Sequence, residues 1–120
     1  MILFDTDVCL SLMAGNEKIQ RQYASLMEEI CVPAPCVQEL FFAAEASENP
    51  EENRTVLEKF LTTVRVIHPV TETCRYAARL QKKLYVRGSV VPQNDVMVFC
   101  MSRILSARLI TLHAGRYRFT

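Results

Sequence analysis

No tryptophan occurs in this 120-residue chain, and glycine and proline are sparse, at three and five residues. Such low glycine and proline contents exclude a collagen-like or low-complexity chain. The longest wholly apolar runs, residues 40–44 and 96–101, are far shorter than the roughly 20 residues of a membrane span. With 50% hydrophobic and 22% charged residues, the sequence therefore predicts one soluble globular domain without a membrane partner.

Cysteine and histidine are present but form no motif for a metal or a disulfide. The five cysteines include no Cys-x-x-Cys pair and lie among apolar neighbours. This pattern predicts reduced, buried thiols in a cytoplasmic protein. His68 and His113 are too isolated to complete the four-ligand set of a structural zinc. The first four residues are apolar and meet Asp5 and Asp7 without any basic residue, so a signal peptide is not expected.

The formal net charge of +1 hides an asymmetry between the two halves of the chain. Residues 1–64 carry 4 basic and 11 acidic side chains, a net charge of −7, whereas residues 65–120 carry 10 basic and 2 acidic side chains, a net charge of +8. A positive half attracts a polyanion or an acidic partner, and a basic solvated face explains the same pattern.

Short apolar runs alternate with helical periodicity along the chain. The runs that favour strands are residues 1–4, 31–33, 64–67 and 108–111, and the segments that favour helices are residues 8–13, 16–30, 35–44, 51–63, 71–88 and 95–106. Strands separated by helices imply a parallel sheet with right-handed crossovers. The predicted fold class is therefore an α/β sandwich.

Aspartate is scarce, with only Asp5, Asp7 and Asp95 in the chain. Asp5 stands at the C-terminal end of the first expected strand, the edge where ligand sites form in an open α/β sheet. Asp95 stands in the first turn of a mostly apolar helix, where free backbone N–H groups favour a carboxylate. Stabilisation of that helix start alone also explains Asp95.

Glu39 is the third acid that the pattern singles out, because it lies between apolar residues on an expected helix. A charge in such surroundings needs a partner or an ion, although the polar edge of an amphipathic helix also explains it. If these carboxylates converge, their repulsion favours a hard divalent cation such as Mg²⁺ or Mn²⁺ and raises the pKa of at least one of them when no metal is bound. Spacing in the sequence leaves their convergence open.

Four segments in order resemble the motifs of PIN-domain ribonucleases, and most of all the VapC-type toxins of bacterial toxin–antitoxin pairs. Residues 3–10 resemble the opening motif, an apolar strand that ends in Asp-Thr-Asn or Asp-Thr-Asp. Residues 35–40 resemble the second motif, whose glutamate is a metal ligand, and residues 91–98 resemble the third, a Pro-x-Asn-Asp start to an apolar helix. Residues 109–113, followed by Tyr117, resemble the final strand and turn. The resemblance implies a single PIN-like α/β/α sandwich with a mainly parallel central sheet.

The same resemblance implies a Mg²⁺- or Mn²⁺-dependent endoribonuclease, the toxin of a VapBC-like pair. Asp5, Glu39 and Asp95 would hold the ion, which would lower the pKa of a bound water and neutralise charge on the phosphate. Asp7 would bind the metal or position that water. A DNA nuclease is a second possibility, because a phosphodiester site of this kind does not by itself exclude DNA.

Other residues receive supporting roles from this interpretation. Thr6 and Thr111 would hydrogen-bond the metal ligands or the water, although ordinary cap and strand positions explain them equally well. The basic half of the chain would contact RNA phosphates without reading sequence, notably through Arg108, Arg116 and Arg118.

One stretch departs from the family pattern. Where relatives often carry an acidic residue after the last strand, residues 113–117 contain no carboxylate. Asp7 would restore one charge, because many relatives have asparagine there. The departure motivates an alternative function, a catalytically impaired PIN-like module that binds RNA or an antitoxin.

The sequence also suggests partners. The expected second helix is apolar, and in the cluster Leu40, Phe41 and Phe42 the two phenylalanines point in different directions on a helix. Both features imply more apolar surface than a core of this size hides. Together with the resemblance, this predicts a two-fold homodimer. A segment of the cognate antitoxin is expected to cover a groove near the acidic site.

Overall fold

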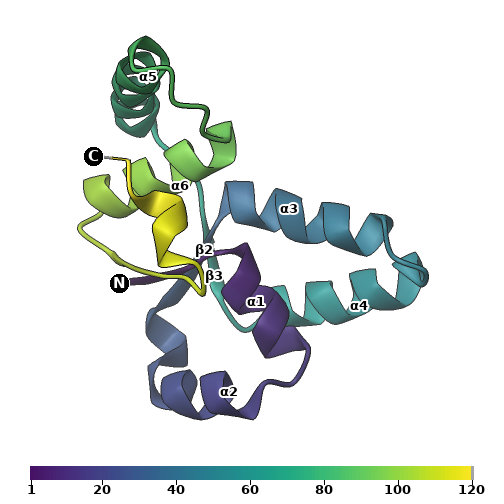
Figure 1. Cartoon of the computed structure of the whole chain (residues 1–120). Coiled ribbons are helices and arrows are strands. Elements are labelled where there is room, and N and C mark those ends of the chain that lie inside the picture. The colour runs from purple at the N-terminus through teal and green to yellow at the C-terminus, as the bar shows by residue number, and fades with distance from the viewer. Residues whose placement is uncertain (120) are drawn as a thin grey trace.

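Four short parallel strands form the centre of the fold in the computed structural model, which describes residues 1–119 (Figure 1). They are β1 (Ile2–Phe4), β2 (Ile30–Pro33), β3 (Arg65–Ile67) and β4 (Arg108–Ile110), in the spatial order β3-β2-β1-β4. Each neighbouring pair runs parallel, with Ile2 opposite Ile30 and Leu3 opposite Leu109. The predicted parallel α/β architecture is therefore confirmed.

The helices occupy the expected segments with small shifts at their ends. They are α1 (Thr6–Met13), α2 (Glu17–Tyr23), α3 (Ala34–Glu45), α4 (Pro50–Leu61), α5 (Thr71–Val86) and α6 (Gln93–Ile104), with short 3-10 helices η1 (Ala24–Glu29) and η2 (Ala114–Tyr117). The expected helix over residues 16–30 is correct only as far as Tyr23. A 3-10 helix rises about 2.0 Å per residue instead of 1.5 Å, so η1 carries the chain to β2 in fewer residues.

Both faces of the sheet are covered, which explains why the two central strands are apolar throughout. Residues of β1 and β2 alternate between the faces. Leu3 and Cys31 pack with Met101 of α6 on one face. Phe4 and Val32 belong to the larger cluster on the other face, to which α1, α2, α3 and α4 contribute. Burial on both faces is the usual state of a parallel sheet.

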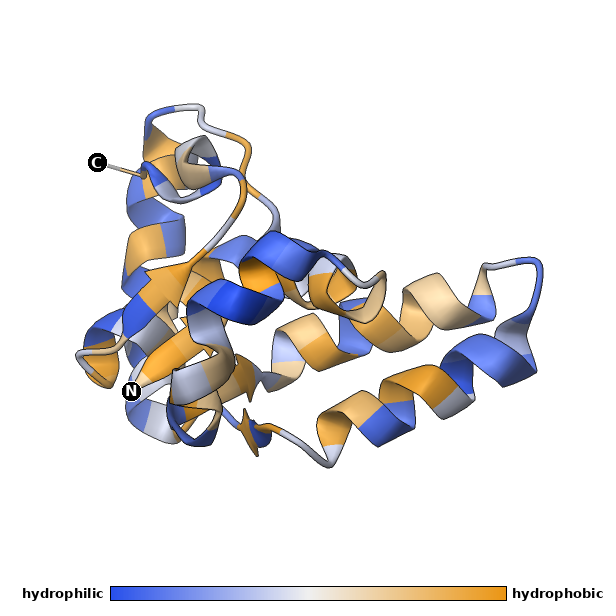
Figure 2. Ribbon diagram, turned by 90° about the horizontal axis from the view of Figure 1, so that it is seen from below, coloured by the Kyte–Doolittle hydropathy of each residue, from blue (hydrophilic) through white to orange (hydrophobic). Residues whose placement is uncertain are grey.

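Outside this core, α3 and α4 form a helical hairpin that projects from the sheet, while α5 packs against α6 (Figure 1). Apolar residues run along both helices of the hairpin, and polar residues gather at its tip (Figure 2). Leu40 and Leu57 are each only 2% exposed and join this hairpin to the sheet. Within residues 1–119, no helix combines the length and apolar character needed to cross a membrane.

The cysteines are free thiols, and four of the five are buried as expected. The prediction is wrong for Cys74, which is exposed on α5. Its neighbour Thr73 and, one turn later, Ala77 form the buried face of that helix. Successive residues in a helix are rotated by about 100°, so the side chain that follows Thr73 turns toward solvent.

Candidate active site

Asp5 follows the last residue of β1 and is completely buried. Its backbone N–H donates to the carbonyl of Ile110 at 3.3 Å, which places it at the carboxyl ends of β1 and β4. Its side chain caps α1, because Oδ1 accepts a hydrogen bond from the Val8 backbone N–H at 3.2 Å. The sequence therefore predicts this position correctly, and a cap fixes the carboxylate at the strand–helix junction.

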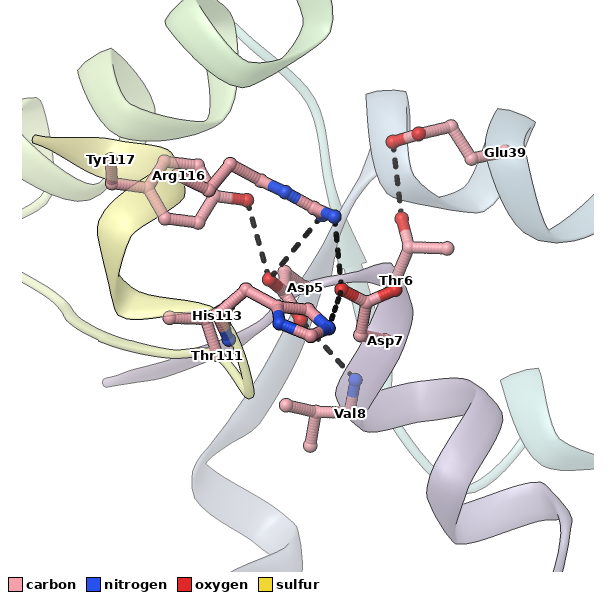
Figure 3. A network of polar contacts seen from close by, with 9 residues as sticks. All are labelled: Asp5, Thr6, Asp7, Val8, Glu39, Thr111, His113, Arg116 and Tyr117. Atoms are coloured by element: carbon pink, nitrogen blue, oxygen red, sulfur yellow. Dashed lines mark hydrogen bonds and ion pairs between the residues drawn. The ribbon is translucent and has the colours of Figure 1, made fainter. Parts of the chain in front are cut away.

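Tyr117 reaches the same carboxylate from η2, its hydroxyl lying 3.4 Å from Asp5 Oδ2 (Figure 3). Burial, followed by the charge of Asp5, raises the pKa of Tyr117 well above its usual range. The phenol therefore keeps its proton near pH 7 and donates a hydrogen bond to the Asp5 carboxylate.

Glu39 lies on α3 and meets the start of α1. The Thr6 hydroxyl donates to Glu39 Oε1 at 3.1 Å (Figure 3). Burial raises the pKa of Glu39, the Thr6 hydrogen bond opposes that rise, and the charge of Asp95 on α6 adds to it. The pKa of Asp95 is raised as well, again chiefly by burial. Converging carboxylates are expected to raise the pKa of at least one of them. Here both pKa values are raised, but desolvation contributes more to the rise than repulsion between the acids does.

A pocket of about 490 Å³ opens above these groups at the carboxyl edge of the sheet. Residues from α1, α3, α6 with its N-cap, and η2 line it: Thr6, Asp7, Glu39, Pro92, Gln93, Asn94, Asp95 and Arg116. Asp5 is not part of the lining, because it is buried beneath Asp7 at the start of α1. Ligands of open α/β sheets bind at this edge.

Asp7 receives two basic side chains from the end of the chain. Its Oδ2 lies 3.1 Å from Arg116 Nη2 and 3.5 Å from His113 Nε2 (Figure 3). The same oxygen is buried and accepts no hydrogen bond, so the Arg116 contact is an ion pair with poor N–H alignment and His113 is a close neighbour. A buried carboxylate oxygen in this state keeps an unused capacity to accept a hydrogen bond or to bind a cation in place of the arginine.

Arg116 is the basic side chain that connects the acids. Its Nη1 lies 4.0 Å from Asp5 Oδ2, while its Nη2 pairs with Asp7. The positive charge lowers the pKa of both Glu39 and Asp95, against the larger effect of burial. Burial in turn lowers the pKa of Arg116, but the charges of Asp7 and Asp95 outweigh it, so the guanidinium stays protonated.

The model of the PIN domain family matches residues 2–114 of the chain. The protein belongs to the PIN domain family. It is 28% identical to Ribonuclease VapC2 of Haemophilus influenzae, over 84% of this chain and 77% of that protein. It is 25% identical to the tRNA(fMet)-specific endonuclease VapC of Salmonella typhimurium, over 80% of this chain and 74% of that protein.

Solved structures agree with this assignment. DNA-bound VapBC from Salmonella typhimurium matches with a TM-score of 0.88 at 22% identity and covers 98% of this chain and 91% of that one. VapBC-1 from nontypeable Haemophilus influenzae matches with a TM-score of 0.84 at 25% identity, over 99% and 92% of the two chains. The PIN-like fold expected from the sequence motifs is confirmed.

The oxygen donors around this pocket are of the chemical type that a hard divalent cation prefers. Carboxylate oxygens predominate, a threonine hydroxyl is adjacent, and the orphaned Asp7 Oδ2 lacks a hydrogen bond. In the arrangement of residues 1–119, however, no three His, Cys, Asp or Glu side chains are grouped so that they would hold one ion. Arg116 supplies the positive charge of the pocket instead.

Besides the buried Asp5, three residues expected at the site do not line the pocket. Arg108 is the first residue of β4, where its N–H donates to the Met1 carbonyl, so it lies at the opposite edge of the parallel sheet from Asp5. Thr111 Oγ1 accepts from the His113 backbone N–H at 3.0 Å and shapes the turn before η2. Arg118 directly follows η2 and is exposed.

Sequence reasoning also missed contacts that the structure makes plain. It assigned no role to His113 beyond its place in the last motif, and it did not foresee that Arg116 pairs with Asp5 and Asp7. The sequence offered one indication of this pairing. Residues 113–117 lack the acid that relatives often carry and contain Arg116 instead.

Proposed function

We propose that the chain, residues 1–120 acting as a single PIN-like domain, is an endoribonuclease and the toxin of a toxin–antitoxin pair. One observation carries the proposal: Asp7, Glu39 and Asp95 line one pocket at the carboxyl edge of the sheet, with Asp5 beneath them. Relatives named ribonuclease and endonuclease over most of their length support it.

The acids would hold Mg²⁺ or Mn²⁺, with Asp5, Glu39 and Asp95 as the principal ligands and Asp7 beside them. When bound, such an ion supplies an activated water and stabilises negative charge on the phosphate. The remaining chemistry comes from the chain itself. Thr6 orients the Glu39 carboxylate through its hydrogen bond, and Tyr117 holds Asp5. These contacts fix the acids before a substrate arrives.

RNA backbone contacts are proposed for the basic residues at the end of the chain. Arg116 borders the pocket, and exposed Arg118 lies two residues further along the chain, so these two are the proposed phosphate contacts. Arg108 is not included, because it lies at the far edge of the sheet. Thr111 contributes through the turn that carries His113 rather than through the pocket.

The proposed partners are a cognate antitoxin and a second copy of the chain. An apolar pocket of about 260 Å³ between α1, α3 and α4 is lined mainly by apolar residues, among them Leu10, Met13, Leu40 and Val56. It suits an apolar antitoxin segment, and Phe42, which is 72% exposed, suits a homodimer contact. A cytoplasmic location completes the proposal, since free thiols are typical of reducing compartments.

The second candidate function is a PIN-like module that has lost catalysis. It is favoured by Arg116, whose positive charge stands where relatives often carry an acid and pairs with Asp5 and Asp7. Such a module would still bind an antitoxin or RNA while cleaving neither RNA nor DNA.

Cleavage of a generic structured RNA separates the two functions. Purified protein is incubated with labelled RNA in Mn²⁺ and in EDTA, alongside Asp5→Asn, which retains a side chain able to cap α1. A nuclease should cleave only with metal, and Asp5→Asn should lower the rate about 100-fold or more. The matched control Glu51→Gln, an exposed acid of α4, should leave the rate unchanged.

Each outcome of this experiment has a clear meaning. Equal rates for wild type and Asp5→Asn would assign the cleavage to a contaminant and contradict the proposal. Binding of RNA without cleavage at any metal concentration would favour the non-catalytic module. A single-stranded DNA of the same sequence, tested in parallel, would reveal a DNA nuclease by preferential loss of the DNA.

A further inference from the structure

The guanidinium of Arg116 reaches into the acidic pocket from η2. Its two terminal nitrogens approach two different carboxylates, with Nη2 at 3.1 Å from Asp7 Oδ2 and Nη1 at 4.0 Å from Asp5 Oδ2 (Figure 3). The side chain therefore bridges the two aspartates of the strand–helix junction. Because 31% of the Arg116 side chain is exposed, it borders solvent as well as the acids.

Two further acids, Glu39 and Asp95, lie near Arg116. Glu39 comes from α3 and Asp95 from α6, and the charge of Arg116 acts on both of them. His113 is the second basic side chain on Asp7, but it is 65% exposed and lies on the outer side of that carboxylate. The inner cation of the pocket is thus Arg116.

We propose that Arg116 is a built-in counter-ion that occupies the place of a divalent cation and must withdraw before the pocket binds one. The proposal rests on the proposed function, because that function assigns the carboxylates to a metal. It concerns the strength of metal binding, which is measured separately from RNA cleavage.

Two physical reasons make the two cations exclusive. The Asp5 and Asp7 oxygens that face Arg116 belong to the carboxylates that would hold a metal in the proposed function. A divalent ion on them would also lie within a few ångströms of the guanidinium, where like charges repel strongly in a half-buried site. Withdrawal needs only a side-chain rotation, because Arg116 already borders solvent.

Charge and identity at position 116 should therefore set metal affinity. Arg116→Gln removes the competing charge, and Arg116→Glu adds a carboxylate at the position where relatives often carry one. Arg116→Lys keeps the charge on a different head group. The matched control is Arg118→Gln, which removes the same charge from an exposed residue two positions away.

The experiment titrates each purified full-length variant with Mn²⁺ and counts free Mn²⁺ by electron paramagnetic resonance. Wild type should bind weakly, Arg116→Gln about tenfold or more tightly, and Arg116→Glu more tightly still. Arg116→Lys and Arg118→Gln should stay within about threefold of wild type. Adding Asp5→Asn to Arg116→Gln should abolish the gain, which locates the ion at this pocket.

The proposal is overturned if Arg116→Gln binds Mn²⁺ no more tightly than wild type, or if Arg118→Gln gains as much. Wild-type protein gives an independent reading that requires no variant to fold. Mg²⁺ should move the arginine Nε resonance of Arg116 in a ¹⁵N spectrum toward that of a solvent-exposed arginine, and an unmoved resonance at saturating Mg²⁺ also contradicts withdrawal. Tighter metal binding by Arg116→Gln without RNA cleavage would support this proposal and contradict the proposed nuclease function.

Discussion

The hydroxyl of Thr6 donates to Glu39 Oε1 at 3.1 Å, across 33 residues of sequence. Thr6 stands at the first residue of α1 and Glu39 lies in the middle of α3, so this hydrogen bond joins two elements that border the pocket. It holds one acid in place and, by favouring the carboxylate form, opposes the rise that burial causes in the pKa of Glu39.

The first prediction removes this hydrogen bond. Thr6→Val keeps the shape of the side chain but leaves Glu39 without its donor, so the free energy of unfolding should fall by about 1 kcal/mol. The pKa of Glu39 should rise further, because the hydrogen bond lowers it. Urea denaturation measures the first effect, and carboxyl NMR measures the second. Thr6→Ser, which keeps the hydroxyl, should resemble wild type in both, and an equal loss in Thr6→Ser would contradict the assignment.

Much of this arrangement could be predicted from the sequence. The order of strands and helices followed from apolar runs and periodicity, and Asp5 followed from its place after a buried strand. The contacts within residues 113–117 did not follow, because a four-residue 3-10 helix has no periodicity to read. The direction in which Arg116 points depends on the turn after β4, which the hydrogen bond between Thr111 and His113 shapes, and on the packing of η2 against α6.

The position of Arg108 shows a second limit of sequence reasoning. Its neighbours in sequence lie near the site, yet a strand of three residues is long enough to place its first and last residues at different edges of the sheet. Arg108 is close to Thr111 in the sequence, but this did not place it close to Asp5 in the structure. The register of β4 against β1 decides the matter, and no residue pattern in so short a strand specifies register.

The second prediction concerns pH in the absence of metal. The folded state raises the pKa of Glu39 and Asp95 above their ordinary values of 4.5 and 3.8, so it binds their protons more tightly than the unfolded state. Their stabilising contribution is complete below those values and is lost as pH rises through the raised pKa values. Glu39→Gln removes one of the two titrations, so stability should decline less steeply above pH 4.5 than in wild type.

Urea denaturation between pH 4 and pH 8 in EDTA measures this difference. The comparison uses the slope of unfolding free energy against pH, because other groups titrate equally in both proteins. Glu51→Gln, an exposed acid in the first turn of α4, serves as the control and should keep the wild-type slope. A slope in Glu39→Gln that matches wild type would show that burial does not perturb Glu39.

The third prediction concerns the five thiols. Cys74 is exposed and the other four are buried, so an aromatic disulfide reagent at pH 8 should react rapidly with one thiol per native chain. Burial also raises the pKa of Cys36 to about 12 and that of Cys100 to about 11, which leaves little reactive thiolate at pH 8. Cys74→Ser should remove the rapid reaction, and denatured wild type should react at all five positions. Rapid native reaction of a second thiol would contradict the burial of the core cysteines.

The fourth prediction tests how the helical hairpin supports the site. Leu57 of α4 is 2% exposed and packs in the same cluster as Leu40, which directly follows Glu39 on α3. Leu57→Ala leaves a cavity there and should lower the free energy of unfolding by about 2–5 kcal/mol, as other buried leucine truncations do. The neighbouring Val56 is 45% exposed, so Val56→Ala should change stability by only about 0.5 kcal/mol. Leu57→Ala leaves every carboxylate in place, so Mn²⁺ binding to the folded protein should survive below the melting temperature.

A loss of Mn²⁺ binding while the circular dichroism spectrum stays native would show that packing between α3 and α4 also positions Glu39.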